Sequence, residues 1–418
     1  MPNYAKMPHA ERRGPRFAGG IGIFLCELLV CAAAALGWLY SSLPDTVYVE
    51  QGQQVHIARL PFLSAQADIG ARDTAATAQT GSYNTTLSLG GVLPVKTVHT
   101  VVTDRPVVTV CGTPFGVKMF SDGALVVAFT DINTRNGSAN PAKEAGLRLG
   151  DLIVSVGGQS THSNQELSDA ITAAQGAAVN VVFLRGGEQR AAQLTPVQDE
   201  TGRWMAGMWV RDSSAGVGTL TFVDERNGIF AGLGHSISDG DTGESITLRS
   251  GEIVPCFIVG CTKGIAGSSG ELKGKFSGGF SVGTILLNGS TGVYGTTRSI
   301  FSGTPTTVAF AQEVVVGPAQ IWTTIEGQAP QVYDVEIEKI SYAGNNENRN
   351  LILHVTDTEL LETTGGIVQG MSGSPILQNG QLVGAVTHVL VNDPTRGYGI
   401  FAQTMLAQAD VIAQQNAA

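Results

Sequence analysis

Apolar and polar positions alternate over short stretches along most of the chain beyond residue 100, and Gly, Asn and Asp interrupt the alternation every few residues. This pattern is typical of strands joined by tight turns. Two candidate hairpins are especially clear: TLTFV (219–223) turning into IFAGLGH (229–235), and PILQ (375–378) turning through Asn379-Gly380 into QLVGAVTHVLV (381–391). The pattern therefore predicts a mainly β protein.

The longest apolar run breaks this pattern. Residues 18–40 carry one charge, Glu27, and as a helix they would span roughly 30 Å, the thickness of a bilayer core. Four basic side chains and one acidic side chain lie in residues 1–17. We expect a cytoplasmic basic tail, a transmembrane signal anchor at 18–40 and an extracytoplasmic remainder. Signal-peptide cleavage in the alanine tract 32–35 is the alternative.

Residues 41–100 are rich in Gln, Ala, Thr and Ser, with a few extended pieces. This composition fits a short β element or a linker, and we assign the segment as a stalk. The chain has 418 residues, enough for two or three domains.

Charge and cysteine content exclude several classes of partner. The net charge is -10, and no basic cluster follows the N-terminal tail, which argues against a nucleic-acid partner. No Cys/His cluster has metal-ligand spacing, so we predict no metal and no cofactor. Cys256 and Cys261 would pair only if their backbones approached within disulfide geometry, which the sequence leaves open.

Residues 101–196 change to a pattern of strand, loop, strand and helix, with AGLRLGDLIVSVGG (145–158) as the most specific stretch. This region resembles a PDZ domain. Such domains bind a carboxyl terminus or an extended peptide by adding a strand, with the N–H groups of a glycine-containing loop holding the carboxylate. The matching loop would be Pro114, Phe115, Gly116 and Val117. The alternative is a domain that only packs against its neighbour.

The stretch QGMSGSPILQNG (369–380) places Ser372 between two glycines. A serine hydroxyl needs a neighbouring base to act as a nucleophile. Three histidines lie in the C-terminal region. His354 and His388 sit inside alternating apolar runs, as strand-face histidines do, whereas His235 stands among small residues at a strand end. We therefore predict His235 as the base.

An acyl-transfer enzyme must also stabilise an oxyanion, and two backbone N–H groups do this well. A glycine at 370 permits the conformation that turns its N–H toward that of Ser372, so we predict these two N–H groups as the oxyanion hole. Ser374 lacks this arrangement. The Gly-x-Ser-Gly-x-Pro signature and the His-before-Ser order resemble chymotrypsin-like serine proteases, which implies a β-barrel peptidase domain at 197–418.

The whole order of anchor, PDZ-like region, GLGHS and TGGIVQGMSGSPI closely resembles the bacterial stage IV sporulation protein B peptidases. This resemblance implies that Asp357, in HVTDTELLETTGG, is the acid of the triad. Two alternatives remain from the residues alone. Asp239 or Asp241 follows the histidine closely, and a capping box from Thr356 to Glu359 would make Asp357 only a first-turn acid of a short helix.

The resemblance further implies a role in endospore formation, in the space between the two forespore membranes. There the enzyme would cleave a membrane-bound regulator of an intramembrane protease that activates a late sigma factor, and it would cleave itself in the stalk. The PDZ domain would bind a peptide, which could be the chain's own N-terminal region. The rival functions are an HtrA-like quality-control protease, in which the PDZ domain follows the protease, and a non-enzymatic scaffold.

Overall fold

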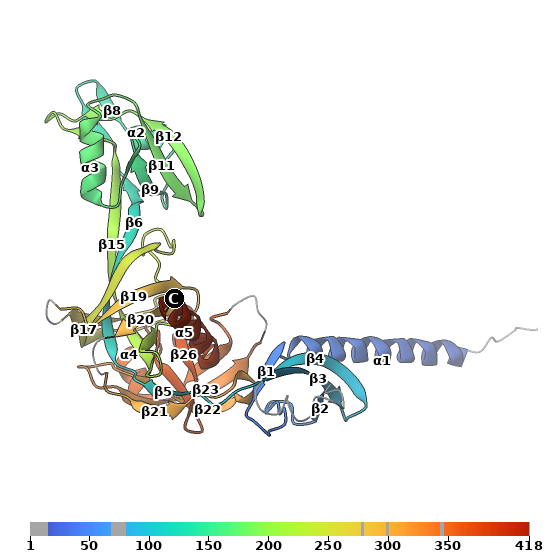
Figure 1. The fold of residues 1–418 in the computed structure, drawn as a ribbon. Helices are drawn as coiled ribbons and strands as arrows, with labels where there is room; N and C mark the ends of the chain where they lie inside the picture. The colour runs from blue at the N-terminus through green and yellow to red at the C-terminus, as the bar shows by residue number, and fades with distance from the viewer. Residues whose placement is uncertain (1–15, 68–80, 277–279, 298–300, 343–346, 418) are drawn as a thin grey trace, which may run out of the picture.

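A computed structural model describes residues 16–417 except 68–80, 277–279, 298–300 and 343–346. Half of the chain is strand, which confirms the mainly β class. Figure 1 shows an N-terminal helix with a small sheet, a central body, and a third part at the far end of two long strands.

The N-terminal helix α1 (Arg16–Ser41) contains the predicted anchor. Its stretch Phe24–Ser41 is long and apolar enough to serve as a membrane anchor or a signal sequence, and only 6% of that stretch is buried. Its last turns reach the following sheet, where Leu39 is buried.

The predicted stalk is a folded β element, so that assignment was wrong. Its four strands pair in the order β1-β4-β3-β2. They are β1 (Thr46–Val49), β2 (Leu63–Ala67), β3 (Gly81–Leu89) and β4 (Leu93–Val102). Leu39 and Leu43 close a small core with Leu87 and Val98. Arg105 then joins Glu50 of this element to Glu313 of the central body.

Two unusually long strands, β6 (Pro114–Phe129) and β15 (Met208–Asp224), pair with each other along most of their length. Their first and second halves lie in different domains. Residues Pro114–Phe120 of β6 lie in the central body, and the chain between the two strands forms the part farthest from it (Figure 1). The PDZ domain thus lies N-terminal to most of the peptidase, as predicted, but it is inserted after the first half of β6, which already belongs to the peptidase barrel.

The insertion has its own core of Leu167, Ile171, Val181 and Phe183, among others. Asn140 caps the first helix by accepting the N–H of Lys143, and Ser163 caps the second by accepting that of Glu166. The elements of the insertion are β7 (Ile132–Thr134), β8 (Gly137–Ala139), α2 (Pro141–Glu144), β9 (Leu152–Val156), β10 (Gln159–Ser160), α3 (Asn164–Ala173), β11 (Val179–Arg185), β12 (Glu188–Leu194), β13 (Val197–Gln198) and β14 (Trp204–Met205).

The central body begins with a ring of six strands. Pairing runs β6-β17-β19-β20-β16-β15, and β15 returns to β6, so this sheet closes on itself. The strands added to β6 and β15 are β16 (Ile229–Gly232), β17 (Leu248–Thr262), β19 (Gly283–Gly289) and β20 (Gly292–Thr297). Edge strands extend the sheet: β5 (Val107–Val110), β18 (Glu271–Phe276) and β21 (Thr304–Thr307).

A second closed barrel follows in the order β22-β23-β24-β27-β26-β25. Its strands are β22 (Gly317–Thr323), β23 (Gln331–Ile340), β24 (Leu351–Val355), β25 (Pro375–Gln378), β26 (Gln381–Val389) and β27 (Arg396–Phe401). The short helices η1 (Ala311–Glu313) and α4 (Thr358–Thr364) lie in its connections, and α5 (Ala402–Ala417) packs between the barrels on β16 and β26. Two six-stranded barrels confirm the expected peptidase architecture.

Candidate active site

The turn that carries Ser372 lies between the two barrels. Its backbone bonds β15 on one side, where Thr219 N donates to Ser372 O at 2.9 Å, and β26 on the other, where Gly373 N donates to Val386 O at 2.7 Å. Gly373 has φ 95°, and a Cβ there would lie 1.9 Å from the Thr219 carbonyl oxygen. Only glycine permits this approach. The glycine that follows Ser372 is therefore required for the two barrels to meet at this turn.

The segment that carries His235 meets the same turn. His235 follows β16 through two residues in the left-handed region, Leu233 (φ 64°) and Gly234 (φ 70°). A Cβ on Gly373 would lie 2.5 Å from Leu233 N, and one on Gly234 would lie 2.8 Å from Thr387 Cγ2. The backbones next to the predicted nucleophile and base are thus in contact, although 137 positions separate the two residues.

The two side chains are not hydrogen-bonded to each other in this structure. Ser372 Oγ donates to the carbonyl of Thr387 at 2.7 Å, and His235 Nδ1 lies 2.7 Å from the carbonyl of Ser236. Catalytic hydrogen bonds often tighten only when substrate binds.

The state of His235 suits a general base. A carbonyl only accepts, so Nδ1 carries the hydrogen and Nε2 keeps its lone pair. Burial lowers the pKa of His235, and the hydrogen bond to Ser236 partly offsets this. The imidazole is therefore neutral near pH 7 and able to take a proton.

His388, predicted to be a strand-face histidine, is a second imidazole at this site. Its ring centroid lies 4.6 Å from that of His235. Among the residues that the structure describes, none bonds to the buried Nδ1 of His388, and burial lowers the pKa of His388 to about 4. A bulge between Val386 and Val389 turns this part of β26 toward the serine turn. The sequence contained a signal for this neighbour. If the hairpin register Pro375↔Ala385 is extended by three residues, Ser372 comes level with residue 388.

The structure does not bring Asp357 to His235. Asp357 is the N-cap of α4, accepting Leu360 N at 3.0 Å, and its other oxygen accepts Asp334 N at 3.4 Å. The capping box from Thr356 was thus misplaced by one residue, because Asp357 itself caps the helix. No hydrogen bond or ion pair of the described residues joins a carboxylate to His235. The role of Asp357 as triad acid stays a prediction.

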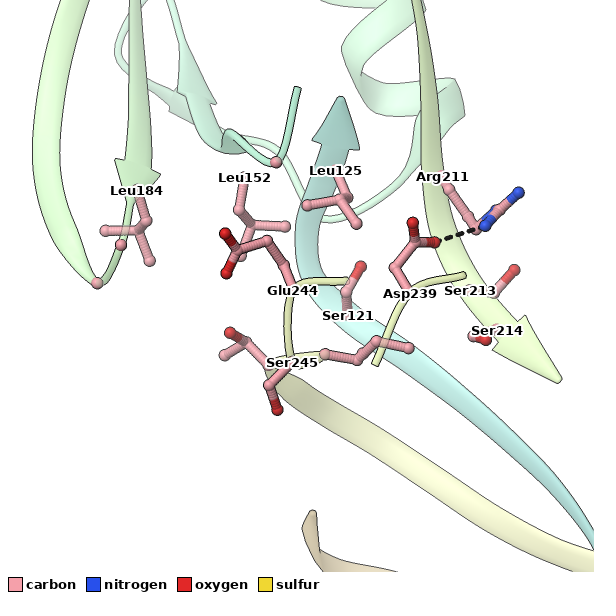
Figure 2. Close-up of a pocket in the computed structure, with 15 residues that line it drawn as sticks. Ser121, Leu125, Leu152, Leu184, Arg211, Ser213, Ser214, Asp239, Glu244 and Ser245 are labelled. Carbon is pink, nitrogen blue, oxygen red and sulfur yellow. Dashed lines mark hydrogen bonds and ion pairs between the residues drawn. The ribbon is translucent and has the colours of Figure 1, made fainter. Parts of the chain in front are cut away.

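The alternative acids are committed elsewhere. Arg211 of β15 lies 2.5 Å from Asp239 and 2.8 Å from Asp241. Figure 2 shows the first of these ion pairs, at a cavity where the loop after His235 meets the PDZ domain. Asp239 also accepts the N–H groups of Asp241 and Thr242. These acids therefore shape the loop that follows His235.

His354, the remaining histidine, lies on the outer face of its barrel, with Nδ1 3.5 Å from Glu338. It belongs to a surface ion-pair group with Arg396. This placement agrees with a strand-face histidine that has a partner.

The predicted oxyanion donors are free to bind. Gly370 has φ 97°, and no hydrogen bond in the described part of the chain uses the N–H of Gly370 or of Ser372. The Gly370 carbonyl is held by the Thr219 hydroxyl at 2.9 Å. Ser374, the rival serine, is buried and donates to Met371 O at 2.7 Å.

The predicted PDZ ligand loop was wrong. Pro114, Phe115, Gly116 and Val117 form the start of β6, paired with β15 and β17, and Phe115 packs in the barrel core. Between Met208 and Ser214, β15 pairs with β6 and with no other strand in the described part of the chain. The helix α3 begins beside this edge, where Asn164 N donates to Asp212 at 2.8 Å. Gly207, with φ 79°, precedes this edge.

Among the residues that the structure describes, no group of three or more metal-ligating side chains occurs. Cys256 and Cys261 are both free thiols. Burial raises the pKa of Cys256 to about 11, so that thiol is protonated at neutral pH.

Two closed barrels, with a serine turn and a histidine segment meeting between them, define a chymotrypsin-like serine peptidase with an inserted PDZ domain. Comparison with known families agrees. Residues 202–406 match the SpoIVB peptidase S55 family, and residues 139–185 match the PDZ domain. The chain thus carries a SpoIVB-type S55 peptidase region at residues 202–406, with a PDZ domain N-terminal to it.

Individual relatives match over short stretches. The chain is 43% identical to serine protease HTRA1 of Xenopus tropicalis over 60 residues, which are 14% of this chain and 13% of that protein. The chain therefore spans about an eighth of the length of this curated relative. The PDZ domain of an SdrC-like protein from Listeria monocytogenes is 26% identical, over 22% of this chain and 90% of that one, with a TM-score of 0.18.

Proposed function

We propose that this protein is a membrane-anchored serine endopeptidase. The observation that carries this proposal is the contact between the Ser372 turn and the His235 segment across the two barrels. Its neighbours fit the same chemistry: a neutral imidazole with a free Nε2, and two unpaired N–H groups next to the nucleophile.

The geometry supports the following steps. Ser372 Oγ leaves the Thr387 carbonyl and gives its proton to His235 Nε2 as Oγ attacks the scissile carbonyl carbon. The N–H groups of Gly370 and Ser372 then bind the oxyanion. The imidazolium donates the proton to the departing amine, which leaves an acyl-enzyme on Ser372. Water, deprotonated by His235, attacks this ester, and the proton returns to Ser372 Oγ as the acid product leaves.

The Ser236 carbonyl holds Nδ1–H during these steps, as the third group of a triad does. Asp357 remains the predicted acid, and taking that place would require its carboxylate to leave the N-terminus of α4. Because an oriented carboxylate stabilises imidazolium more than a carbonyl does, this shift would separate an active from a resting state.

The biological role that we propose is signalling in sporulation. The peptidase would cut a membrane-bound regulator and so release an intramembrane protease that activates a late sigma factor. The S55 family match and the apolar α1 support this role and an extracytoplasmic catalytic domain. The test is replacement of the chromosomal copy in a sporulating host by Ser372→Ala. Late sigma-factor reporters should stay silent, and normal reporter activity would contradict the role.

The PDZ domain would bind a peptide at the open edge of β15, including a segment of its own N-terminal region. Arg211 lies on that strand and binds both acids of the loop after His235, so occupancy of the edge can reach the base. Arg211→Gln should weaken any dependence of cleavage on an added PDZ peptide. If cleavage by Arg211→Gln depends on the added peptide as much as in wild type, then Arg211 does not link the PDZ edge to His235. Self-cleavage in residues 41–100 is tested by mass spectrometry of the chain, with Ser372→Ala as control.

A quality-control protease is the second candidate, favoured by the short stretch of high identity to HTRA1. Broad digestion of unfolded casein would support it, whereas a single-target peptidase would leave casein largely intact. A non-enzymatic scaffold would not react with a fluorophosphonate, because that reaction requires an activated serine.

A further inference from the structure

The turn between β3 and β4 exposes an apolar surface without a charge. The run LGGVLP (89–94) is exposed throughout, and Val92 at its tip is 88% exposed. Gly90 and Gly91 have φ of 60° and 75°, which forms the tight turn that projects Val92. An exposed apolar turn is costly in water unless something covers it.

The strand register enlarges this surface. Leu89 pairs with Leu93 across the turn, and Leu63 of β2 pairs with Leu89 on the other side. Phe62, just before β2, is 53% exposed and lies at the same end of the sheet. Leu89, Val92 and Leu93 therefore form one apolar patch at this turn, which we call the β3–β4 tip.

The end of α1 packs against the same sheet that carries the β3–β4 tip. Leu39 of α1 shares a core with Leu87 and Val98 of the same sheet, and Lys96 of β4 lies 5.0 Å from the Tyr40 ring centre. Figure 1 shows β4 and β3 running alongside α1, with their turn on the side from which the helix comes. The end of α1 and the sheet are thus held in a fixed relation.

Simple geometry then gives the depth of the tip. Leu93 is three residues before Lys96, roughly 10 Å along an extended strand. The same length along α1 corresponds to about six or seven residues, which places the tip level with the interior of the apolar stretch Phe24–Ser41. A sheet fixed to a membrane-spanning α1 would therefore carry the tip to the hydrocarbon boundary.

We propose that the β3–β4 tip inserts into the lipid bilayer beside α1 as a second membrane contact. This inference rests on the anchored form of the proposed function. One helix alone allows the domain outside the membrane to tilt and turn, whereas two contacts fix its orientation. The orientation of the sheet would also fix that of the peptidase, because Arg105 forms ion pairs with Glu50 of the sheet and Glu313 of the peptidase. The active site would then be held at a fixed height above the membrane surface.

The test uses the full chain in phosphatidylglycerol–phosphatidylethanolamine vesicles, with the photoreactive residue p-benzoylphenylalanine at single positions. Val92→p-benzoylphenylalanine should give a lipid adduct on the peptide that contains residue 92. The matched control is Asn379→p-benzoylphenylalanine, in the exposed turn between β25 and β26, which should give none. Val30→p-benzoylphenylalanine, on the exposed face of α1, reports on the anchor itself.

The outcomes separate the two claims. Lipid adducts at positions 30 and 92 but not at 379 support the tip. An adduct at 30 with none at 92, or a protein–protein adduct at 92, overturns the tip while leaving the anchor intact. No adduct at 30 or 92 overturns both. Reaction of Ser372 with a fluorophosphonate in the same vesicles checks peptidase activity independently of every one of these results. Leu93→Asp in the Val92 variant should abolish the lipid adduct, because a carboxylate is expelled from hydrocarbon.

Discussion

The oxyanion hole can be tested with two threonines on one strand. The Thr219 hydroxyl donates to the Gly370 carbonyl at 2.9 Å, and the Thr221 hydroxyl donates to the Gly373 carbonyl at 2.7 Å. Both side chains are buried, at 2% and 0% exposure. Thr219→Val and Thr221→Val each remove one hydrogen bond with little change of shape, so each should lower the free energy of unfolding by about 1 kcal/mol.

Only Thr219→Val should reduce catalysis. It releases Gly370, whose N–H is a predicted oxyanion donor, whereas Thr221→Val releases a carbonyl beyond the nucleophile. Loss of a whole oxyanion donor costs about 100- to 1,000-fold in kcat, so a loosened donor should cost on the order of tenfold. Urea unfolding measures the stability of both variants, and hydrolysis of an activated ester measures kcat. Equal kcat losses in the two variants would refute the assignment of Gly370.

Three further predictions concern residues around the site. Asp357→Ser keeps a good N-cap while removing the carboxylate, so stability should hold while kcat falls by roughly 10⁴-fold; an unchanged kcat would confine Asp357 to capping. Gly373→Ala should yield no active protein, because its Cβ meets backbone at 1.9 Å, and soluble active protein would contradict that packing. Burial lowers the pKa of His388 to about 4, so between pH 6.5 and 4 this imidazole is neutral in the folded protein and protonated in the unfolded chain. Stability therefore falls as the pH falls through that window. His388→Phe should therefore lose less stability than wild type over that window in urea titrations, and identical slopes would exclude a buried neutral imidazole.

Ser372 and His235 could be predicted as a catalytic pair from the sequence because both residues stand at the ends of clear hairpins. The turn after residue 223 and the Asn379-Gly380 turn fix where His235 and Ser372 fall relative to their strands. That these two ends meet depends on contacts between barrels, chiefly at Gly373 and Gly234, which no local pattern specifies.

Other parts were hidden for physical reasons. The N-terminal sheet is rich in Thr and Ser, and few of its residues are both apolar and buried, so its strands resembled a linker. The strand β6 crosses from barrel to PDZ domain without a break, so no turn in the chain marks the boundary between the two domains. The sequence therefore located a PDZ domain but gave it the wrong first strand. His388 was missed because its apolar neighbours matched a core strand.

The role of His235 as the base for Ser372 is tested most directly by the rate at which a fluorophosphonate modifies Ser372. Wild type should be modified at Ser372 alone, with a rate that rises as His235 becomes neutral, and His235→Ala should lower this rate by at least ~1,000-fold. Modification of His235→Ala at the wild-type rate would show that His235 does not activate the serine.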